Sequence, residues 1–252
     1  DLAAGIYALG GAAATEIHFN SVSMTGTRGT ASYSSYALAI GGTTPVLDIK
    51  NNALFNSQSS TGAGQSYAIG LAYTSTTGGY LNLTSIKNGM DTSGTSALLA
   101  KVGSLNQGTG TTLATLAAWT VETGADATSI SADPMFNSTT NLRPQIGSPL
   151  VNAGIPAGGI VNDILCVSRN ITTPSIGAYE IAADGLAPSI TYTPLTTSCL
   201  TGDRLLNGVT IADVTGFPTA GALQPRVYFR KNAGTWFSAQ GVLATGNGIN
   251  GT

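Results

Sequence analysis

Residues 35–41 read Ser-Tyr-Ala-Leu-Ala-Ile-Gly, and residues 66–72 repeat them as Ser-Tyr-Ala-Ile-Gly-Leu-Ala. A weaker copy, Ser-Ala-Leu-Leu-Ala-Lys-Val, occupies residues 96–102, so the copies begin 31 and then 30 residues apart. A repeat of this length is typical of proteins that stack one small unit on the next, because one unit cannot bury its apolar face alone.

A second series of short strands is expected between these copies, at residues 18–24, 48–55 and 85–90. Apolar and polar residues alternate there, and this period of two places one face of each strand inward. We align Ile49-Lys50-Asn51 with Ile86-Lys87-Asn88, 37 residues later. The pattern predicts an all-β fold, with a right-handed parallel β-helix over roughly residues 1–135. The alternative is a β-sandwich with a pseudo-repeat.

Two local features complete this part. Asn20, Asn52 and Asn88 recur between the paired strands, where we interpret them as turn residues that tolerate a left-handed backbone and stack their amides, rather than as ligands. Residues 111–123 have helical apolar spacing, and they predict a short helix capped by Thr111 or Thr112 that protects a sheet edge.

The composition excludes several classes of protein. Only 9% of the 252 residues are charged, whereas about 25% is usual. The 33 glycines and the many Ser, Thr and Asn residues favour short strands and turns over helices. The formal net charge of −2 offers no basic surface for nucleic acid, and no apolar run approaches the roughly 18 residues of a membrane span. We therefore expect neither partner.

The end of the repeat region carries a further motif. It reads Asp133-Pro134-Met135-Phe136, then residues 148–154 as Ser-Pro-Leu-Val-Asn-Ala-Gly, then Asp163 and Arg169, and residues 174–180 as Pro-Ser-Ile-Gly-Ala-Tyr-Glu. This ending resembles that of bacterial cell-surface proteins with pectate-lyase-like right-handed β-helices, which are often exported by type IX secretion. Many of those proteins have a glycine in the turn before the arginine, where this chain has Cys166-Val167-Ser168. The resemblance implies an extracellular or cell-surface location.

We accordingly expect a β-helix over residues 1–181, with a segment from about residue 131 that caps its last coil. Residues 182–188 read as a linker. Residues 189–252 resemble the start of an immunoglobulin-like β-sandwich, with a hairpin around residues 232–234. A complete domain of that kind takes about 100 residues, so this one is expected to be incomplete, and a neighbouring copy could add a strand to its open edge.

The acidic residues of the repeat region form no close pair in the sequence, so no catalytic, cofactor-binding or metal site is expected. The best surface-site candidate combines Asp48 and Lys50 on one strand with Lys87 in the equivalent place one coil later, and a solvated ion-pair ladder explains these charges as well. His18 is the single histidine and is expected at the surface or between coils.

Three hypotheses for function remain. The first is a non-catalytic surface or filament module for adhesion or matrix scaffolding, which self-associates, contacts neighbouring domains or binds polysaccharide. The second is a polysaccharide lyase or glycoside hydrolase on a β-helix. The third is an ice-binding surface, based on the triplets Thr25-Gly26-Thr27, Thr74-Ser75-Thr76 and Thr109-Gly110-Thr111.

The chain contains two cysteines, Cys166 in the terminal motif and Cys199 beyond the linker. An exported protein permits a disulfide, and one between these residues would staple the two modules together. Free thiols are the alternative.

Overall fold

The computed structural model describes residues 2–11, 13–43, 45–75, 79–94 and 97–181 of the first part of the chain. Beyond these it describes residues 188–196, 198, 202, 205–206, 208–213, 216–219, 224–230, 233–246 and 250–251. The chain divides into two compact units, Asp1–Ile181 and Ala182–Thr252. The regular structure is mostly β-strand, which confirms the predicted all-β class.

Three sheets of parallel strands make up most of the first unit. Sheet A contains β1 (Ala3–Leu9), β4 (Ser35–Gly41), β7 (Ser66–Leu71) and β10 (Ala97–Val102), and β11 (Thr111–Leu113) adds to it antiparallel. Sheet B contains β2 (Thr15–His18), β5 (Leu47–Lys50) and β8 (Leu83–Ile86). Sheet C contains β3 (Ser21–Met24), β6 (Ala53–Asn56) and β9 (Gly89–Thr92).

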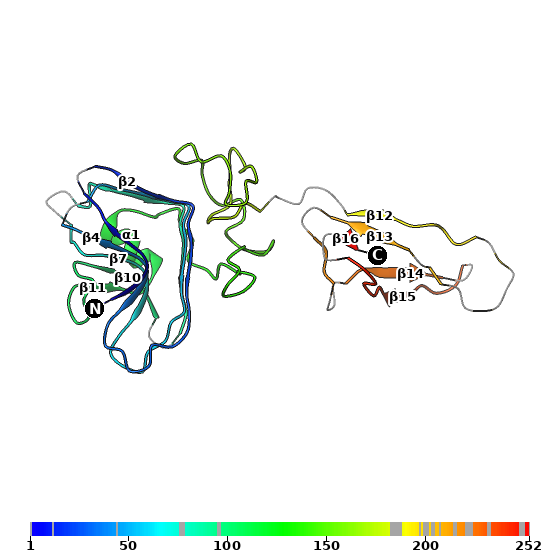
Figure 1. Ribbon diagram of the computed structural model, residues 1–252, viewed down its shortest axis with the longest axis horizontal. Helices are drawn as coiled ribbons and strands as arrows, with labels where there is room; N and C mark the ends of the chain where they lie inside the picture. The colour runs from blue at the N-terminus through cyan, green and yellow to red at the C-terminus, as the bar shows by residue number, and fades with distance from the viewer. Residues whose placement is uncertain are drawn as a thin grey trace. The chain divides into compact units, whose positions relative to one another are not determined.

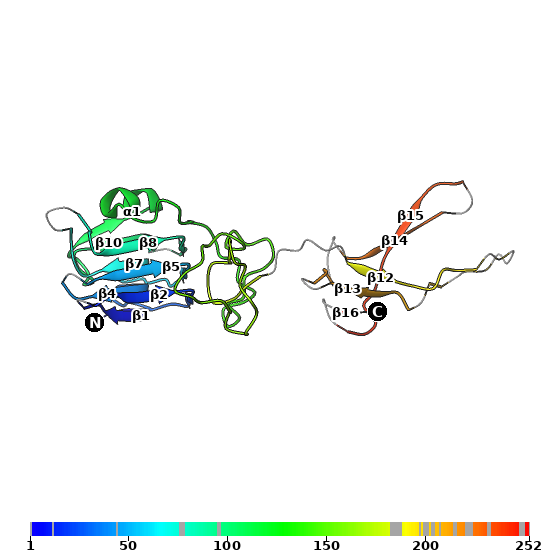
Figure 2. The same ribbon diagram turned by 90° about the horizontal axis from the view of Figure 1, so that it is seen from above.

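The chain visits the sheets in the order A, B, C three times before it returns to sheet A at β10. We call one passage through the three sheets a circuit. Figure 2 shows β1, β4, β7 and β10 stacked in that order, and Figure 1 looks along the stack so that the strands of each sheet overlap. The cyclic order and parallel pairing are compatible with a β-helix.

Alternation along the strands of sheets B and C points one set of side chains into the space between the sheets, and in β4 both Ala37 and Leu38 face it. Register then brings like residues side by side in columns: Leu38 pairs with Ile69, and Val22 with Leu54. The core also includes Ile17, Ile40, Leu47, Ile49, Leu71 and Met90, all of which are buried. The apolar periodicity of the sequence therefore corresponds to a continuous interior.

The helix begins later than the sequence predicted. Residues 111–113 form β11, because they pair with residues 100–102 of β10 and cover its edge. Helix α1 spans Leu116–Thr123, with the hydroxyl of Thr115 capping its first turn and Gly124 at φ 72° ending it. Trp119 anchors the helix on the core with no exposed surface, and α1 lies beyond β10 in Figure 2.

Residues 131–181 lie elsewhere than expected. Their apolar side chains pack on the outer side of sheet C, where Leu150 contacts Gly89 and Ala53 is buried beside Leu150 and Ile176. Ala178 N–H donates to Ser21 Oγ at 2.9 Å. Because Ser21, Ala53 and Gly89 belong to β3, β6 and β9, this segment runs along all three circuits rather than over the last coil.

The second unit contains two small antiparallel sheets. One has the order β12 (Ser189–Thr191), β13 (Thr210–Ala212), β16 (Asn250–Gly251), and the other pairs β14 (Arg226–Phe229) with β15 (Phe237–Gln240). The predicted hairpin is therefore present. Of its predicted turn, Asn232 lies outside the described residues.

Candidate functional site

The outer face of sheet B holds the charged side chains singled out in the sequence. Glu16, Asp48 and Thr84 pair across β2, β5 and β8, and His18, Lys50 and Ile86 pair two positions further along. These six residues face outward because Ile17 and Ile49, which lie between them, are in the core. We call this surface the sheet B face.

Asp48 is the centre of this face. Its Oδ2 lies 2.9 Å from Lys50 Nζ and 3.2 Å from His18 Nε2, so the carboxylate is neighboured by a cation on its own strand and an imidazole on the preceding one. About a quarter of the Asp48 and Lys50 side chains is exposed, at 25% and 22%, whereas His18 is 3% exposed. Of the two places predicted for His18, the surface or between coils, an exposed surface position is wrong; the ring lies on the outer face of sheet B beside Asp48 of the next circuit.

The turn at Gly158 covers His18. A Cβ atom at Gly158 would lie 2.9 Å from His18 Nδ1, and the φ of +58° at this position favours glycine. The segment that follows the stack thus reaches the sheet B face and closes over its histidine, a contact for which the sequence carries no signal.

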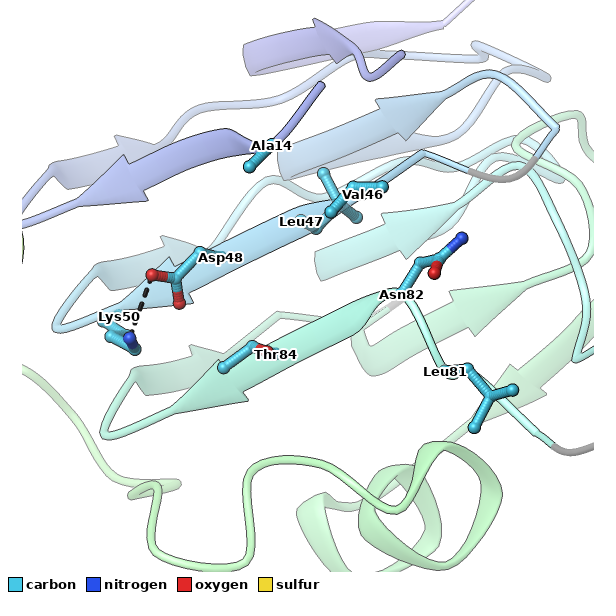
Figure 3. A pocket seen from close by; sticks show the side chains of 8 residues that line it. All are labelled: Ala14, Val46, Leu47, Asp48, Lys50, Leu81, Asn82 and Thr84. Atoms are coloured by element: carbon cyan, nitrogen blue, oxygen red, sulfur yellow. Dashed lines mark hydrogen bonds and ion pairs between the residues drawn. The ribbon is translucent and has the colours of Figure 1, made fainter. Parts of the chain in front are cut away.

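A shallow groove of about 290 Å³ borders Asp48 (Figure 3). Figure 3 shows the bonded Asp48 and Lys50 on β5, with Thr84 on the next strand and Leu81 at the end of the groove. The remaining lining residues are Ala14, Val46, Leu47 and Asn82. The groove offers one carboxylate, one ammonium, one hydroxyl and one amide, a set that can bind sugar hydroxyls.

Lys87 does not occupy the position predicted for it. Lys50 pairs with Ile86, so Lys87 stands opposite Asn51, at the corner where the chain leaves sheet B. Lys87 and Asn51 share left-handed backbone angles, with φ of 57° and 58°. The alignment of Ile49-Lys50-Asn51 with Ile86-Lys87-Asn88 was therefore wrong by one residue, and the expected ladder of Asp48, Lys50 and Lys87 does not form.

The structure brings Glu16 and Asp48 into register on β2 and β5, so two carboxylates that stand 32 residues apart in the sequence share this face. Hydrolysis of a glycosidic bond uses two carboxyl groups roughly 5–10 Å apart. Here His18 contacts both, at 3.9 Å from Glu16 Oε2 and 3.2 Å from Asp48 Oδ2. Among the described residues, no group of three His, Cys, Asp or Glu side chains is placed to hold a metal ion.

The recurring asparagines form a hydrogen-bonded column. Asn20 donates its backbone N–H and its Nδ2 to Asn52 Oδ1, at 3.0 and 2.9 Å. Asn52 donates the same two groups to Asn88 Oδ1, at 2.9 and 3.1 Å. We call this column the asparagine ladder. The predicted amide stacking agrees with it, but the left-handed positions are the preceding residues, Phe19, Asn51 and Lys87.

Residues of the terminal motif form a buried polar cluster in residues 131–181. Arg169 Nη1 lies 3.4 Å from Glu180 Oε2, and its guanidinium stacks 3.9 Å from the centre of the Phe19 ring. Asp163 accepts backbone N–H groups from Leu165, Val167 and Glu180. Burial lowers the pKa of Arg169, and the nearby carboxylates of Glu180 and Asp163 oppose that shift. The cluster holds this segment together and against the stack.

Cys166 lies in the same segment and is exposed. Its φ of 62° is left-handed, and its N–H donates to Asp163 O in a tight turn, which explains why a glycine suits this position. Cys199 lies outside the described residues, so the pairing of the two cysteines stays a prediction.

The outer side of sheet A contains buried groups that the sequence did not reveal. Tyr36 and Tyr67 stack with their ring centres 5.0 Å apart, and residues 103–110 cover them through a bond from Tyr36 Oη to Leu105 O. Lys101 is 1% exposed and donates to Asn106 O at 2.6 Å. Burial lowers the pKa of Lys101. Its counterparts on the neighbouring strands are Gly70 and Ala39, and a lysine in a position otherwise occupied by small residues gives no local signal of burial.

No family model, no curated protein and no solved structure matches the chain. Within the described residues, none of the helices has the length and apolarity needed to cross a bilayer.

Proposed function

We propose that this chain is a non-catalytic module of an extracellular surface protein, serving in adhesion or matrix scaffolding. In this proposal its first unit is a right-handed parallel β-helix and its second an incomplete immunoglobulin-like domain. The main support is the sheet B face, where Asp48 is already neighboured by Lys50 and His18 in a shallow groove. Such a surface offers hydrogen-bonding groups to a ligand, while Asp48 is already engaged by its neighbours.

Glycan is the ligand class that this groove suits best. Sugars present many hydroxyls, each of which both donates and accepts hydrogen bonds. Asp48 accepts, Lys50 donates, and Thr84 and Asn82 do both, while Leu81 supplies an exposed apolar surface for a ring face. Contacts of this kind are weak individually, and repetition along an extended surface protein would raise the overall affinity.

The proposal is tested by presenting the whole chain with a panel of acidic and neutral polysaccharides. We expect binding without release of reducing or unsaturated ends. The variant Asp48→Asn is expected to weaken binding, while Asp133→Asn, which changes an exposed acid of residues 131–181, is expected to leave it unchanged. If Asp48→Asn binds as tightly as the original chain, the ligand binds elsewhere and the groove is not the glycan site.

The second candidate is a polysaccharide lyase or hydrolase. The observation that favours it is the same groove, since a carboxylate beside a lysine can serve proton transfer at a sugar ring. Product release that is lost in both Asp48→Asn and Lys50→Gln would establish this alternative and overturn the non-catalytic proposal.

Ice binding has less support. The triplet at residues 25–27 lies beside Ser59, since Thr27 bridges to that residue, and the triplet at residues 109–111 lies beyond β10. Thr76 of the remaining triplet lies outside the described residues. Thermal hysteresis in millimolar protein would revive this hypothesis.

The export route is also part of the proposal. The resemblance of residues 131–181 to the ending of type IX-exported surface proteins supports it, and protease accessibility on intact cells tests it.

A further inference from the structure

The two ends of the stack differ in how their strand edges are covered. At the end reached last, β11 pairs with β10, Asp126 N–H donates to Ser85 O of β8, and Ile130 bridges to Gly89 of β9. All three sheets are thus covered there. At the other end β1, β2 and β3 each pair with one neighbour only, so each is an edge strand among the described residues.

Side-chain cover differs in the same way. Every residue of β4 is buried, whereas β1 alternates between half-buried and exposed residues. Tyr7 and Leu9 of β1 are 52% and 72% exposed, although they stand in register with buried Ala39 and Gly41 of β4. Edge strands with open backbone groups and apolar side chains are surfaces on which further strands pair.

The hydrogen bonds of the asparagine ladder all run in one direction along the stack. Each asparagine gives its backbone N–H and Nδ2 to the Oδ1 of the asparagine one circuit later. The last one, Asn88, gives these groups to Ser129 Oγ and Asp126 Oδ1, which end the column with acceptors. The first asparagine, Asn20, donates its backbone N–H and Nδ2 to Asn52. Its own Oδ1 accepts no hydrogen bond from any described residue. The open end therefore presents an acceptor that a further donor can reach.

We propose that the β1–β2–β3 end of the stack is a docking surface for one further circuit of parallel strands, supplied by polypeptide N-terminal to Asp1. An asparagine at the B–C corner of that circuit would donate its backbone N–H and Nδ2 to Asn20 Oδ1, as Asn20 does to Asn52. The added strands would pair with β1, β2 and β3 and cover Tyr7 and Leu9.

A second copy of the chain fits this surface less well. Its far end is covered by β11, α1 and residues 126–130, so it could offer only its own open end. The two copies would then meet head to head, and each would present the acceptor Asn20 Oδ1 with its ladder donors already bonded to Asn52. Two acceptors cannot bond, and the ladder could not continue.

The test extends the full 252-residue chain with a copy of residues 33–64 fused directly before Asp1. This places the copied asparagine 32 residues before Asn20, the spacing that separates Asn20 from Asn52. One control carries a scrambled copy. A matched control carries the copy with its Asn52 equivalent changed to alanine. Hydrogen–deuterium exchange is followed in peptides that cover β1–β3.

We expect the intact copy to slow exchange in β1–β3 by about tenfold relative to the scrambled copy, since amides gain partners. The alanine control should retain strand protection but lose about fivefold around Asn20, the effect of roughly one hydrogen bond. Equal exchange in the intact and scrambled extensions would overturn the proposal. So would a concentration-dependent dimer of the unextended chain in which β1 is already protected.

Discussion

The corner between sheets B and C depends on two adjacent residues with different tasks. The first, Phe19, Asn51 or Lys87, turns the chain with a left-handed φ of 55–58°. The second, Asn20, Asn52 or Asn88, bonds along the stack. Such a corner leaves few polar groups unpaired in the interior, which matters because an unpaired buried polar group costs about 1–3 kcal/mol.

The substitution Asn52→Ala should lower the free energy of unfolding by about 3 kcal/mol, because it removes the acceptor of Asn20 and the Nδ2 donor to Asn88 in a buried position. Asn20→Ala, at the half-buried end of the ladder, should cost about 1 kcal/mol. Urea denaturation followed by circular dichroism measures both. Equal losses would contradict the view that the ladder is closed on one side and open on the other.

Cys166 occupies a left-handed turn that an L-residue tolerates at a cost of about 1 kcal/mol. Cys166→Gly should therefore raise the free energy of unfolding by about 1 kcal/mol in the presence of a reductant. Cys166→Ala serves as the control, since it removes the thiol and keeps the Cβ atom. If the glycine variant is no more stable than the alanine variant, the turn is not strained as inferred.

At the scale of elements, residues 131–181 contain none of the named strands and are held by packing and by the cluster around Arg169. Arg169→Ala would leave Glu180 buried without its cation, and the segment should loosen by about 3 kcal/mol or more. Limited proteolysis should then cut within residues 131–181 while β1–β10 stay intact. Arg143→Ala, an exposed arginine of the same segment, should change nothing. If β1–β10 are cut as readily as residues 131–181 in Arg169→Ala, the strands and the segment unfold together and the prediction is wrong.

The tyrosines packed around the sheets make stability sensitive to alkaline pH. Burial raises the pKa of Tyr67, Tyr73 and Tyr80 to about 12. In the unfolded chain tyrosine ionises near pH 10. Because the folded pKa is the higher one, the stability these groups contribute is complete below pH 10 and falls as the pH rises from about 10 to 12. Absorbance at 295 nm should show part of the tyrosines ionising only as the fold is lost. Ionisation of all nine near pH 10 in the folded chain would contradict this.

The repeats predicted the strands of sheet A and the register of β4 with β7, because Ser35 pairs with Ser66 as their spacing implied. The third copy was aligned one residue too early, since Ser66 pairs with Ala97. The register of sheet B was harder. Asn51 and Asn52 are adjacent, so either can be aligned with Asn88, and only the bonded ladder and the inward position of Ile49 select Asn52. Lys87 was misplaced for that reason.

The place of residues 131–181 could not be predicted from sequence. The outer column of sheet C that receives them, Ser21, Ala53 and Gly89, is scattered along the chain. Each residue is unremarkable by itself. Only the register shows that these small residues form one column on which residues 131–181 can pack. The turn at Gly158, which covers His18, is placed by the same packing.

At the scale of the molecule, the two units differ in how much apolar surface they bury. The first unit encloses a continuous core, whereas every residue of β14 and β15 in the second is exposed, including Tyr228 and Phe229 at 65% and 51%. All strand pairs between described residues fall within one unit or the other. The fold of the stack is therefore expected to draw little stability from residues beyond 181.

A chain ended after Leu186 tests this expectation and keeps the new carboxylate away from buried Ile181. Its melting midpoint should differ from that of the full chain by less than about 2 °C, since a domain of this size shifts 2–4 °C for each 1 kcal/mol. Exchange in β1–β11 should also be unchanged. A full chain treated under oxidising conditions is the informative comparison, because a Cys166–Cys199 disulfide would link the units and leave no thiol to titrate after denaturation. If the melting midpoints differ by more than this and the difference disappears on reduction, the disulfide couples the two units. If the difference persists after reduction, the stack does depend on residues beyond 181, and the prediction is wrong.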